Sequence, residues 1–225
     1  MDRATTPNFD SATETIEELG IAGLKVVQPI HGFRFGTDAV ALARFVRGRS
    51  VDVAVDIGCG CAIIPILLVG AMGVGRAYGV ELQPRIADMA KRSVQLSGLD
   101  GKVTIVNAPI QQVYKTIPQC SIVTANPPYF KTNSGQTSDD VSVATARFEA
   151  SLTLSETVTI ASQMLATGGK FCIVYKVDRL AEVVTLCSNA RLEPKVIQWL
   201  GSKLFLLQCT KDGKTGLKVV ASETP

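Results

Sequence analysis

The feature that most constrains the fold of this chain is a regular alternation of short apolar runs and longer amphipathic segments from residue 51 onward. The short runs are rich in β-branched residues and predict strands at 51–56, 77–81, 103–106, 121–125 and 170–175. The longer segments predict helices at 61–72, 84–98, 154–165 and 179–190. Because strands separated by helices imply right-handed crossovers, we expect an α/β fold with a mainly parallel sheet.

The two ends of the chain extend this pattern. Runs at 195–200 and 204–209 are close enough to pair as an antiparallel hairpin. Residues 1–20 are polar and predict a partly frayed lead-in, followed by a strand at 24–28 and a helix at 38–47 with Thr37 as its N-cap. The 225 residues contain no repeat and no linker, so we expect one domain.

Composition excludes several classes of protein. Hydrophobic residues make up 46% of the chain, yet no apolar run approaches the roughly 18 residues of a membrane helix. The first 18 residues lack the apolar core of a signal peptide. The six cysteines show no Cys-x-x-Cys spacing, so we interpret them as reduced thiols of a cytoplasmic protein without a metal site.

Charge is unevenly distributed along the chain. The formal net charge is only +3, but residues 170–218 contain nine Lys or Arg and four acids, whereas residues 1–20 carry a net charge of −4. A basic half is compatible with a polyanionic partner, and a solvated surface is the alternative.

A glycine-rich turn predicts a cofactor site. Asp56-Ile57-Gly58-Cys59-Gly60 follows the first strand and opens a helix, where glycines permit a tight turn and close approach of a ligand. A carboxylate at Asp56 repels a pyrophosphate but suits an ammonium group. Glu81 ends the next strand, at the position from which an acid accepts hydrogen bonds from ribose hydroxyls. Ile63 stands where a third glycine would complete a nicotinamide-dinucleotide motif, which argues against that cofactor.

A second motif, Asn126-Pro127-Pro128-Tyr129, lies where the strand at 121–125 ends. Ligands of open α/β sheets bind beyond the carboxyl ends of the strands. The Asn126 side chain offers a carbonyl acceptor, and the prolines leave a rigid loop with bare carbonyls. Acceptors beside the flat Tyr129 ring suit a planar amino group on a stacked base. A surface turn that contains two prolines is the alternative interpretation.

Together these motifs resemble the Rossmann-like S-adenosylmethionine (SAM) methyltransferases, and the second one resembles that of enzymes that methylate amino groups. The resemblance implies a seven-stranded sheet ending in an antiparallel hairpin, with helices on both faces. It implies cofactor contacts from Asp56, Gly58, Gly60, Glu81, Leu82, Asn107, Ala108 and Asn126. Ala62 departs from the pattern where many such enzymes have a glycine, and Pro109 stands where they usually have an aspartate.

A closer similarity extends along most of the chain. It is carried by residues 32–42, 79–83, 87–94, 126–131, 146–149, 179–180 and 211–214. These stretches are similar to bacterial tRNA1(Val) adenine-N6-methyltransferases, which implies methylation of the adenine at position 37, beside the anticodon. The lead-in, residues 1–48, would then cover the site, with cofactor contacts from Phe35, Gly36, Thr37 and Asp38.

The resemblance also implies roles in catalysis and substrate binding. The Asn126 side-chain oxygen and the Pro127 carbonyl would accept the two N–H bonds of the adenine amino group, Pro128 would keep the loop rigid, and Tyr129 would stack on the base. Candidates for further substrate contacts are Phe130, Lys131, Arg147 and Lys176. Phe148 departs from the family, which usually has a histidine there.

Alternatives remain open on the acceptor and on activity. The same motif serves enzymes that methylate DNA or rRNA bases or a protein glutamine, and a catalytically silent protein that binds SAM or RNA is a further alternative. The partners expected are a tRNA and SAM, with no metal and no membrane. A monomer is favoured, although no motif specifies the oligomeric state.

Overall fold

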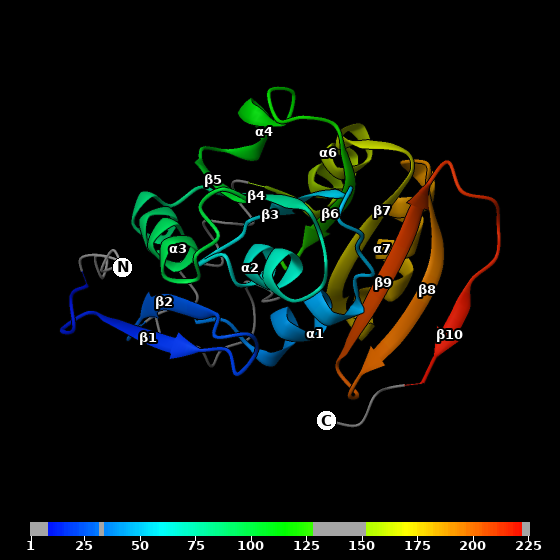
Figure 1. The fold of residues 1–225 in the computed structure, drawn as a ribbon. Helices are drawn as coiled ribbons and strands as arrows, with labels where there is room; N and C mark the ends of the chain where they lie inside the picture. Colours follow the sequence, from blue (N-terminus) through cyan, green and yellow to red (C-terminus); the bar gives the residue numbers. More distant parts are fainter. Residues whose placement is uncertain (1–8, 32–33, 128–151, 222–225) are drawn as a thin grey trace.

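A twisted, mainly parallel sheet runs through the centre of the molecule (Figure 1). The computed structural model describes residues 9–31, 34–127 and 152–221. Within these ranges the sheet has the strand order β10-β8-β9-β7-β6-β3-β4-β5, in which only β9 runs antiparallel to its neighbours. The strands are β3 (Val53–Ile57), β4 (Arg76–Glu81), β5 (Val103–Asn107), β6 (Cys120–Ala125), β7 (Leu165–Lys176), β8 (Leu192–Leu200), β9 (Leu204–Lys211) and β10 (Lys218–Val220).

Helices cover both faces of this sheet, as expected for parallel strands joined by crossovers. One face carries α1 (Thr37–Phe45), α2 (Ile63–Gly70) and α3 (Pro84–Leu96). The other carries α4 (Ile110–Val113), α6 (Leu154–Met164) and α7 (Leu180–Asn189), the last preceded by the short η1 (Val177–Arg179). Successive strand residues serve opposite faces: Ala54 packs with the first group of helices and Val55 with the second. No helix in the described ranges is long and apolar enough to span a membrane.

The predicted core of the fold is confirmed, with one additional strand. The seven strands predicted from residue 51 onward are all present in this sheet, including the antiparallel β8–β9 hairpin. An eighth, β10, pairs in parallel with β8 at the edge of the sheet. It was missed because it has only three residues and all of them are exposed, so it shows no alternation of buried and exposed positions. The predicted loop at 132–142 lies outside the described residues.

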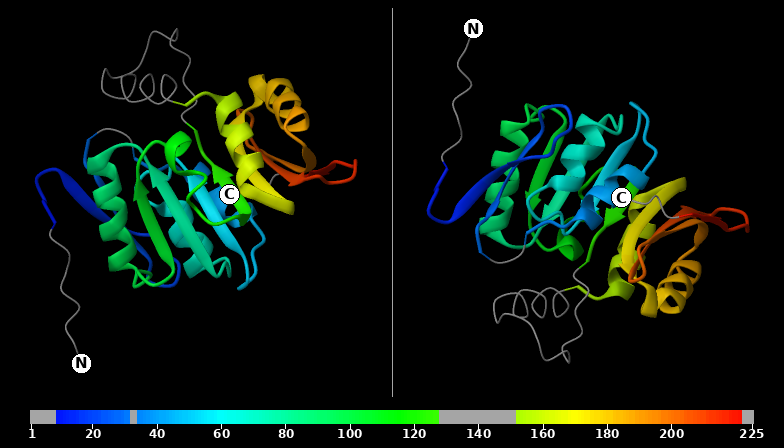
Figure 2. Two further views of the ribbon diagram at one scale, coloured as in Figure 1. Left: turned by 90° about the horizontal axis from the view of Figure 1, so that it is seen from above. Right: turned by 90° about the horizontal axis from the view of Figure 1, so that it is seen from below.

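The lead-in contains a hairpin that the sequence analysis did not predict. Residues 1–20 were expected to be frayed, but β1 (Glu14–Glu18) pairs antiparallel with β2 (Lys25–Pro29). Figure 2 shows this hairpin at one end of the molecule, beside α3, and β10 at the opposite end. The Arg92 guanidinium of α3 holds Glu14 of β1 at 2.6 Å between Nη1 and Oε2. Because Arg92 lies far from Glu14 in the sequence, the polar residues of the lead-in predicted an unstructured segment.

Serines of α3 bind the backbone of the second hairpin strand. Ser93 Oγ accepts a hydrogen bond from Val27 N at 2.8 Å, and Ser97 Oγ accepts one from Lys25 N at 3.0 Å. The Gln28 side chain, which is fully buried, then accepts from Phe35 N at 3.4 Å. The hairpin therefore anchors the chain just before α1, whose first turn lies at the carboxyl end of β6.

Candidate active site

The predicted site residues converge at the carboxyl ends of β3, β4, β5 and β6. Asp56 is paired in register with Thr124 and Ile57 with Ala125, so the turn after β3 and Asn126 after β6 leave the sheet side by side. Glu81 ends β4 and lies opposite Asn107 of β5. This arrangement follows from the parallel order of the four strands.

The glycine-rich turn after β3 folds back onto β4. Gly58 N and Cys59 N both donate to the Val80 carbonyl, at 2.9 and 3.0 Å. Gly58 and Gly60 have φ angles of 72° and 54°, in the left-handed region that favours glycine. Ala62, the departure noted in the sequence, also lies in this region at φ 69°, with its methyl group fully buried as the N-cap of α2. The turn thus forms with an alanine at that position.

Gly79 of β4 leaves room for this turn, a role that was not predicted from the sequence. A Cβ at Gly79 would lie 2.7 Å from Cys59 Sγ and 3.0 Å from both Cys59 Cβ and Ile105 Cδ1. The first of these contacts is closer than real side chains show and the others are tight, so a side chain at residue 79 would force Cys59 to shift. The signal that could have revealed this role is a glycine inside an otherwise apolar strand, which often marks a close approach of another backbone.

Gly79→Ala is expected to destabilise the fold and distort the turn. Overpacking of this kind typically costs about 1–3 kcal/mol, which corresponds to a fall in Tm of about 2–12 °C for a chain of this size. Thermal unfolding followed by circular dichroism measures the effect. Gly101→Ala is the matched control, because a Cβ there meets nothing within 4 Å. Equal Tm values for the two variants would show that Cys59 relaxes without loss.

Asp56 is a buried carboxylate with an unsatisfied oxygen. Its side chain is 2% exposed, and Oδ1 accepts a hydrogen bond from Thr124 Oγ1 at 2.6 Å. Oδ2 has no hydrogen-bond partner among the described residues. Burial raises the pKa of Asp56 from its ordinary 3.8 to about 7; the Thr124 bond opposes the shift, and the nearby Glu81 charge adds to it. A buried acceptor of this kind favours a cationic ligand group.

Glu81 is held rigidly by backbone donors. Oε2 accepts from Gly60 N at 3.1 Å and Oε1 accepts from Gln83 N at 2.8 Å, so the carboxylate joins the glycine-rich turn to the end of β4. Burial raises the pKa of Glu81, and these backbone hydrogen bonds oppose the shift. Each carboxylate oxygen has a second lone pair with which to accept from a hydroxyl group.

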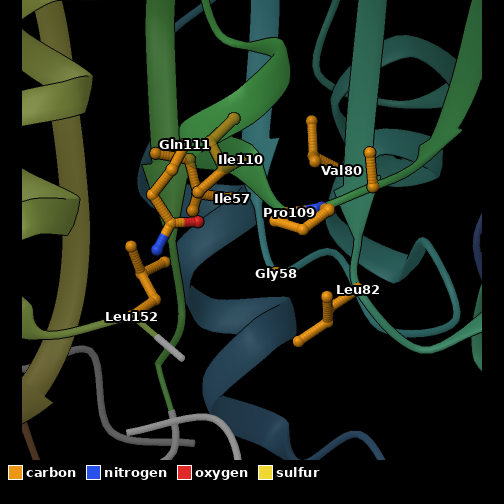
Figure 3. Close-up of a pocket in the computed structure, with 9 residues that line it drawn as sticks. Ile57, Gly58, Val80, Leu82, Pro109, Ile110, Gln111 and Leu152 are labelled. Atoms are coloured by element: carbon orange, nitrogen blue, oxygen red, sulfur yellow. The ribbon is translucent and has the colours of Figure 1, made fainter. Parts of the chain in front are cut away.

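An apolar pocket opens beside these acids (Figure 3). Leu152 and Leu82 lie on opposite sides of its opening, with Gly58 between them and Pro109 above. Its lining residues are Ile57, Gly58, Val80, Leu82, Ala108, Pro109, Ile110, Gln111 and Leu152. Leu82 is more than one-third exposed, although its neighbours at the strand ends are buried. It therefore presents an apolar surface to a ligand. Of the pocket residues, Gly58, Leu82 and Ala108 were predicted to contact the cofactor, and the other six were not.

Asn107 joins the ends of two strands. Its Nδ2 donates to the Glu81 carbonyl at 2.8 Å and to the Leu82 carbonyl at 3.1 Å. Ala108 N donates to the same Glu81 carbonyl at 3.2 Å. The Asn107 amide therefore fixes the backbone that presents Glu81 and Leu82, a positioning role that the sequence motif did not indicate.

Asn126 contacts the first turn of α1. Its Nδ2 donates to Asp38 Oδ2 at 3.3 Å. Gly36 is the N-cap of α1 and Thr37 its first residue, so the prediction of Thr37 as N-cap is wrong. Asp38, in the first turn, accepts from the following amide, Ala39 N, at 2.9 Å through Oδ1. Phe35, half-buried, precedes this turn.

The remaining predicted residues are further from this constellation or outside the described ranges. Lys176 ends β7, two strands along from β3. Pro127 is buried directly after Asn126. Those outside the described residues are Pro128, Tyr129, Phe130, Lys131 and Arg147, together with Phe148. Thr124 and Gln28 were missed as supporting residues because their hydrogen-bond partners lie on other elements.

Comparison with known proteins supports the assignment of the fold. No protein-family model matches the chain. The chain is 31% identical over 143 residues to the tRNA1(Val) (adenine(37)-N6)-methyltransferase of Yersinia pestis (strain Pestoides F), a match that covers 63% of this chain and 57% of the relative. The chain therefore matches a little over half the length of that relative.

Solved structures give the same fold at lower identity. A methyltransferase from Pyrococcus furiosus superposes with a TM-score of 0.63 at 15% identity, covering 85% of this chain and 91% of its own. TrmK from M. capricolum, in complex with S-adenosyl-homocysteine, superposes with a TM-score of 0.58 at 15% identity, covering 83% of this chain and 72% of its own. The chain has the class I methyltransferase fold, and over 143 residues it is a sequence relative of enzymes named as tRNA adenine-N6-methyltransferases.

Proposed function

We propose that this protein transfers a methyl group from SAM to the N6 amino group of an adenine in tRNA. The observation that carries the proposal is the placement of Asn126 at the end of β6, beside the acidic, glycine-rich turn after β3. An amide acceptor next to a site for a positively charged cofactor is what amino-group methylation requires. The names of the sequence relatives support tRNA as the substrate.

The residues present fit SAM. When bound, SAM supplies a methyl group that its sulfonium makes electrophilic. The unsatisfied Oδ2 of Asp56 suits the ammonium group of the methionine moiety. Glu81 suits the ribose hydroxyls, and the apolar pocket lined by Leu82 and Pro109 suits the adenine ring. Other proposed cofactor residues are Phe35, Thr37, Gly58, Gly60, Asn107 and Ala108. Gly36, Asp38 and Asn126, to which the resemblance also gave cofactor contacts, are proposed here to serve the acceptor instead.

The protein's main task in this reaction is to orient and polarise the acceptor. The lone pair of an adenine amino nitrogen is delocalised into the ring, which makes it a poor nucleophile. Hydrogen bonds from this amino group to the Asn126 side-chain oxygen and the Pro127 carbonyl would draw the nitrogen toward a tetrahedral geometry. Preorganised groups of this kind contribute roughly 3 kcal/mol each, and alignment for in-line attack contributes comparably. Tyr129 would stack on the base, and Pro128 would restrict the conformations of the loop.

Within tRNA, the adenine at position 37 of tRNA1(Val) is the specific acceptor proposed. A base in a loop can be splayed out and stacked on an aromatic side chain, as the proposed role of Tyr129 requires. Lys131, Arg147 and Lys176 are proposed to contact phosphates, with Phe130 as a further contact to the base. Residues 1–225 act as one domain in this proposal, in which the segment from Phe35 to Asp38 lies over the cofactor.

The experiment that tests this function offers tritiated SAM and a choice of acceptors. Unmodified tRNA1(Val) transcript is incubated with the protein in parallel with a second tRNA, ribosomal RNA, duplex DNA and a release factor. Label only in tRNA1(Val), lost when adenine 37 is replaced by guanine, is the expected result. Label in a different acceptor would overturn the assigned substrate and retain methyl transfer. SAM binding without label in any acceptor would favour a catalytically silent binding protein.

A further inference from the structure

One hydrogen bond joins two motifs that are 88 residues apart in the sequence. Asn126 Nδ2 at the end of β6 donates to Asp38 Oδ2 in the first turn of α1, at 3.3 Å. Asp38 is half-buried, and Asn126 is also half-buried. The resemblance assigned Asp38 to the cofactor, but this contact links it to the residue that would grip the acceptor.

The chemistry of the pair restricts the orientation of the Asn126 amide. An ionised carboxylate only accepts hydrogen bonds, whereas an amide has a donor end and an acceptor end. If the Asn126 amide were turned by 180°, its oxygen would face the Asp38 oxygen and the two would repel. With Nδ2 directed at Asp38, the amide oxygen occupies the other arm of the planar group. Methylation of an amino group needs that oxygen, and not the NH2 group, toward the acceptor.

We propose that Asp38 is a positioning residue that orients the Asn126 amide so that its oxygen, Oδ1, is presented to the amino group of the substrate. The inference rests on the proposed function and goes beyond it, because it assigns to Asp38 a role in acceptor recognition. It also accounts for the choice of an acid at this position, since an asparagine or a serine can donate as well as accept and would permit both amide orientations.

The structure holds the Asp38 carboxylate in place from two sides. Its Oδ1 accepts from Ala39 N at 2.9 Å, and the same amide also donates to the Gly36 carbonyl at 3.3 Å. A negative side chain in the first helical turn also interacts favourably with the helix dipole. The carboxylate is therefore held at the start of α1 before any ligand binds, and its Oδ2 accepts from Asn126.

Gly36 provides the space for this arrangement. A Cβ at Gly36 would lie 2.6 Å from Asp38 Oδ1. The backbone itself does not require glycine, because Gly36 has φ −102° and ψ 175°, an extended conformation that any residue adopts. The steric demand comes from the Asp38 carboxylate alone. Gly36→Ala is thus expected to displace that carboxylate while the fold persists.

The test compares Asp38→Asn, Asp38→Ala and Gly36→Ala with the wild-type protein. Under the proposal, kcat for tRNA methylation falls about 10–100-fold in Asp38→Ala and Gly36→Ala, as expected when a reacting group loses its alignment. Asp38→Asn, which keeps the shape of the side chain, also lowers kcat. The Kd for SAM and the Tm stay near wild-type values. The double variant Gly36→Ala/Asp38→Ala loses no more than either single variant, because both act through one carboxylate.

Matched controls separate orientation from general damage. Asp88→Asn removes an exposed carboxylate on α3, and Gly101→Ala adds a methyl group in open space; both should retain wild-type kcat. Wild-type kcat in Asp38→Asn and Asp38→Ala would overturn the proposal. A matching rise in the Kd for SAM would show instead that Asp38 holds the cofactor.

A measurement on the protein without ligand gives a readout independent of activity. The side-chain NH2 signal of Asn126 in a 15N–1H NMR spectrum is assigned by its absence in Asn126→Ala. We expect one of its protons to shift upfield in Asp38→Ala and in Gly36→Ala, as its hydrogen bond is lost, and to stay unchanged in Asp88→Asn. An unshifted signal in Asp38→Ala would contradict the proposed contact. If the wild-type protein methylates no acceptor, the proposed function fails, while this spectrum still decides whether the contact exists.

Discussion

Asn126→Ala is expected to lower methyl transfer at least 10²–10³-fold while the affinity for SAM changes little. The alanine removes the side-chain oxygen that would accept from the amino group, and one preorganised polar group at a reacting centre is worth about this factor. The Asp56 and Glu81 carboxylates lie on other strands and remain in place. Single-turnover transfer to tRNA and equilibrium dialysis of labelled SAM measure the two effects separately.

Asn189→Ala is the control, because this asparagine is exposed at the end of α7. That helix packs against β8, which lies four strands from β3 in the sheet. It should match the wild-type protein in both assays. A parallel loss of SAM binding and turnover in Asn126→Ala would contradict the role assigned to the residue. Asn126 would then belong to the cofactor site and not to the acceptor site.

Asp56→Asn is expected to weaken SAM binding about 10²-fold and, at the same time, to stabilise the ligand-free protein above neutral pH. Removing one partner of a buried charge pair typically costs several kcal/mol of binding. Without ligand, however, the ionised carboxylate destabilises the folded protein, since burial raises its pKa to about 7. Calorimetric titration with SAM and thermal unfolding test the two halves of the prediction.

The pH dependence of stability has a definite sign. Between the ordinary pKa of 3.8 and the folded-state value of about 7, the folded protein holds a proton on Asp56 that the unfolded chain has released. The contribution of this group to stability therefore falls as pH rises through that window, and the full penalty is present above pH 7. Asp56→Asn removes this slope, whereas Asp100→Asn, at an exposed position, leaves it unchanged. Identical slopes in wild type and Asp56→Asn would contradict the assignment.

The same titration affects ligand binding in the opposite direction. A cationic ligand group favours the ionised form of Asp56, so below its pKa, binding must first release a proton. We expect the affinity for SAM to rise from pH 6 to pH 8 in the wild-type protein, and this rise to be reduced in Asp56→Asn.

Much of the site was predictable because its signals are local. Asp56, Glu81 and Asn126 each directly follow or end an apolar run, and parallel strands bring such positions to one edge of the sheet. Gly58 and Gly60 were recognisable for the same reason, since a tight turn after a strand demands glycine in the left-handed region. Those residues need no knowledge of distant partners.

The parts that were missed depend on contacts distant in sequence. The strand at Glu14–Glu18 is polar, and its buried glutamate is acceptable only because Arg92 of α3 lies against it. Thr124 was read as a strand residue, although its hydroxyl orients Asp56. Asn107 was predicted only as a cofactor contact, and no signal in the sequence indicated that its NH2 group binds two backbone carbonyls. Hydrogen-bond partners of this kind follow from tertiary packing and leave no periodic signal in the sequence.

Methyl transfer to an adenine amino group is tested most directly by mass spectrometry of tRNA nucleosides after incubation with SAM that carries a deuterated methyl group. We expect N6-methyladenosine heavier by three mass units, located at adenine 37 of tRNA1(Val) and absent with Asn126→Ala. Deuterated methyl on a ring nitrogen, a ribose or a carbon atom would contradict it, because an amide acceptor at the end of β6 serves only an amino group.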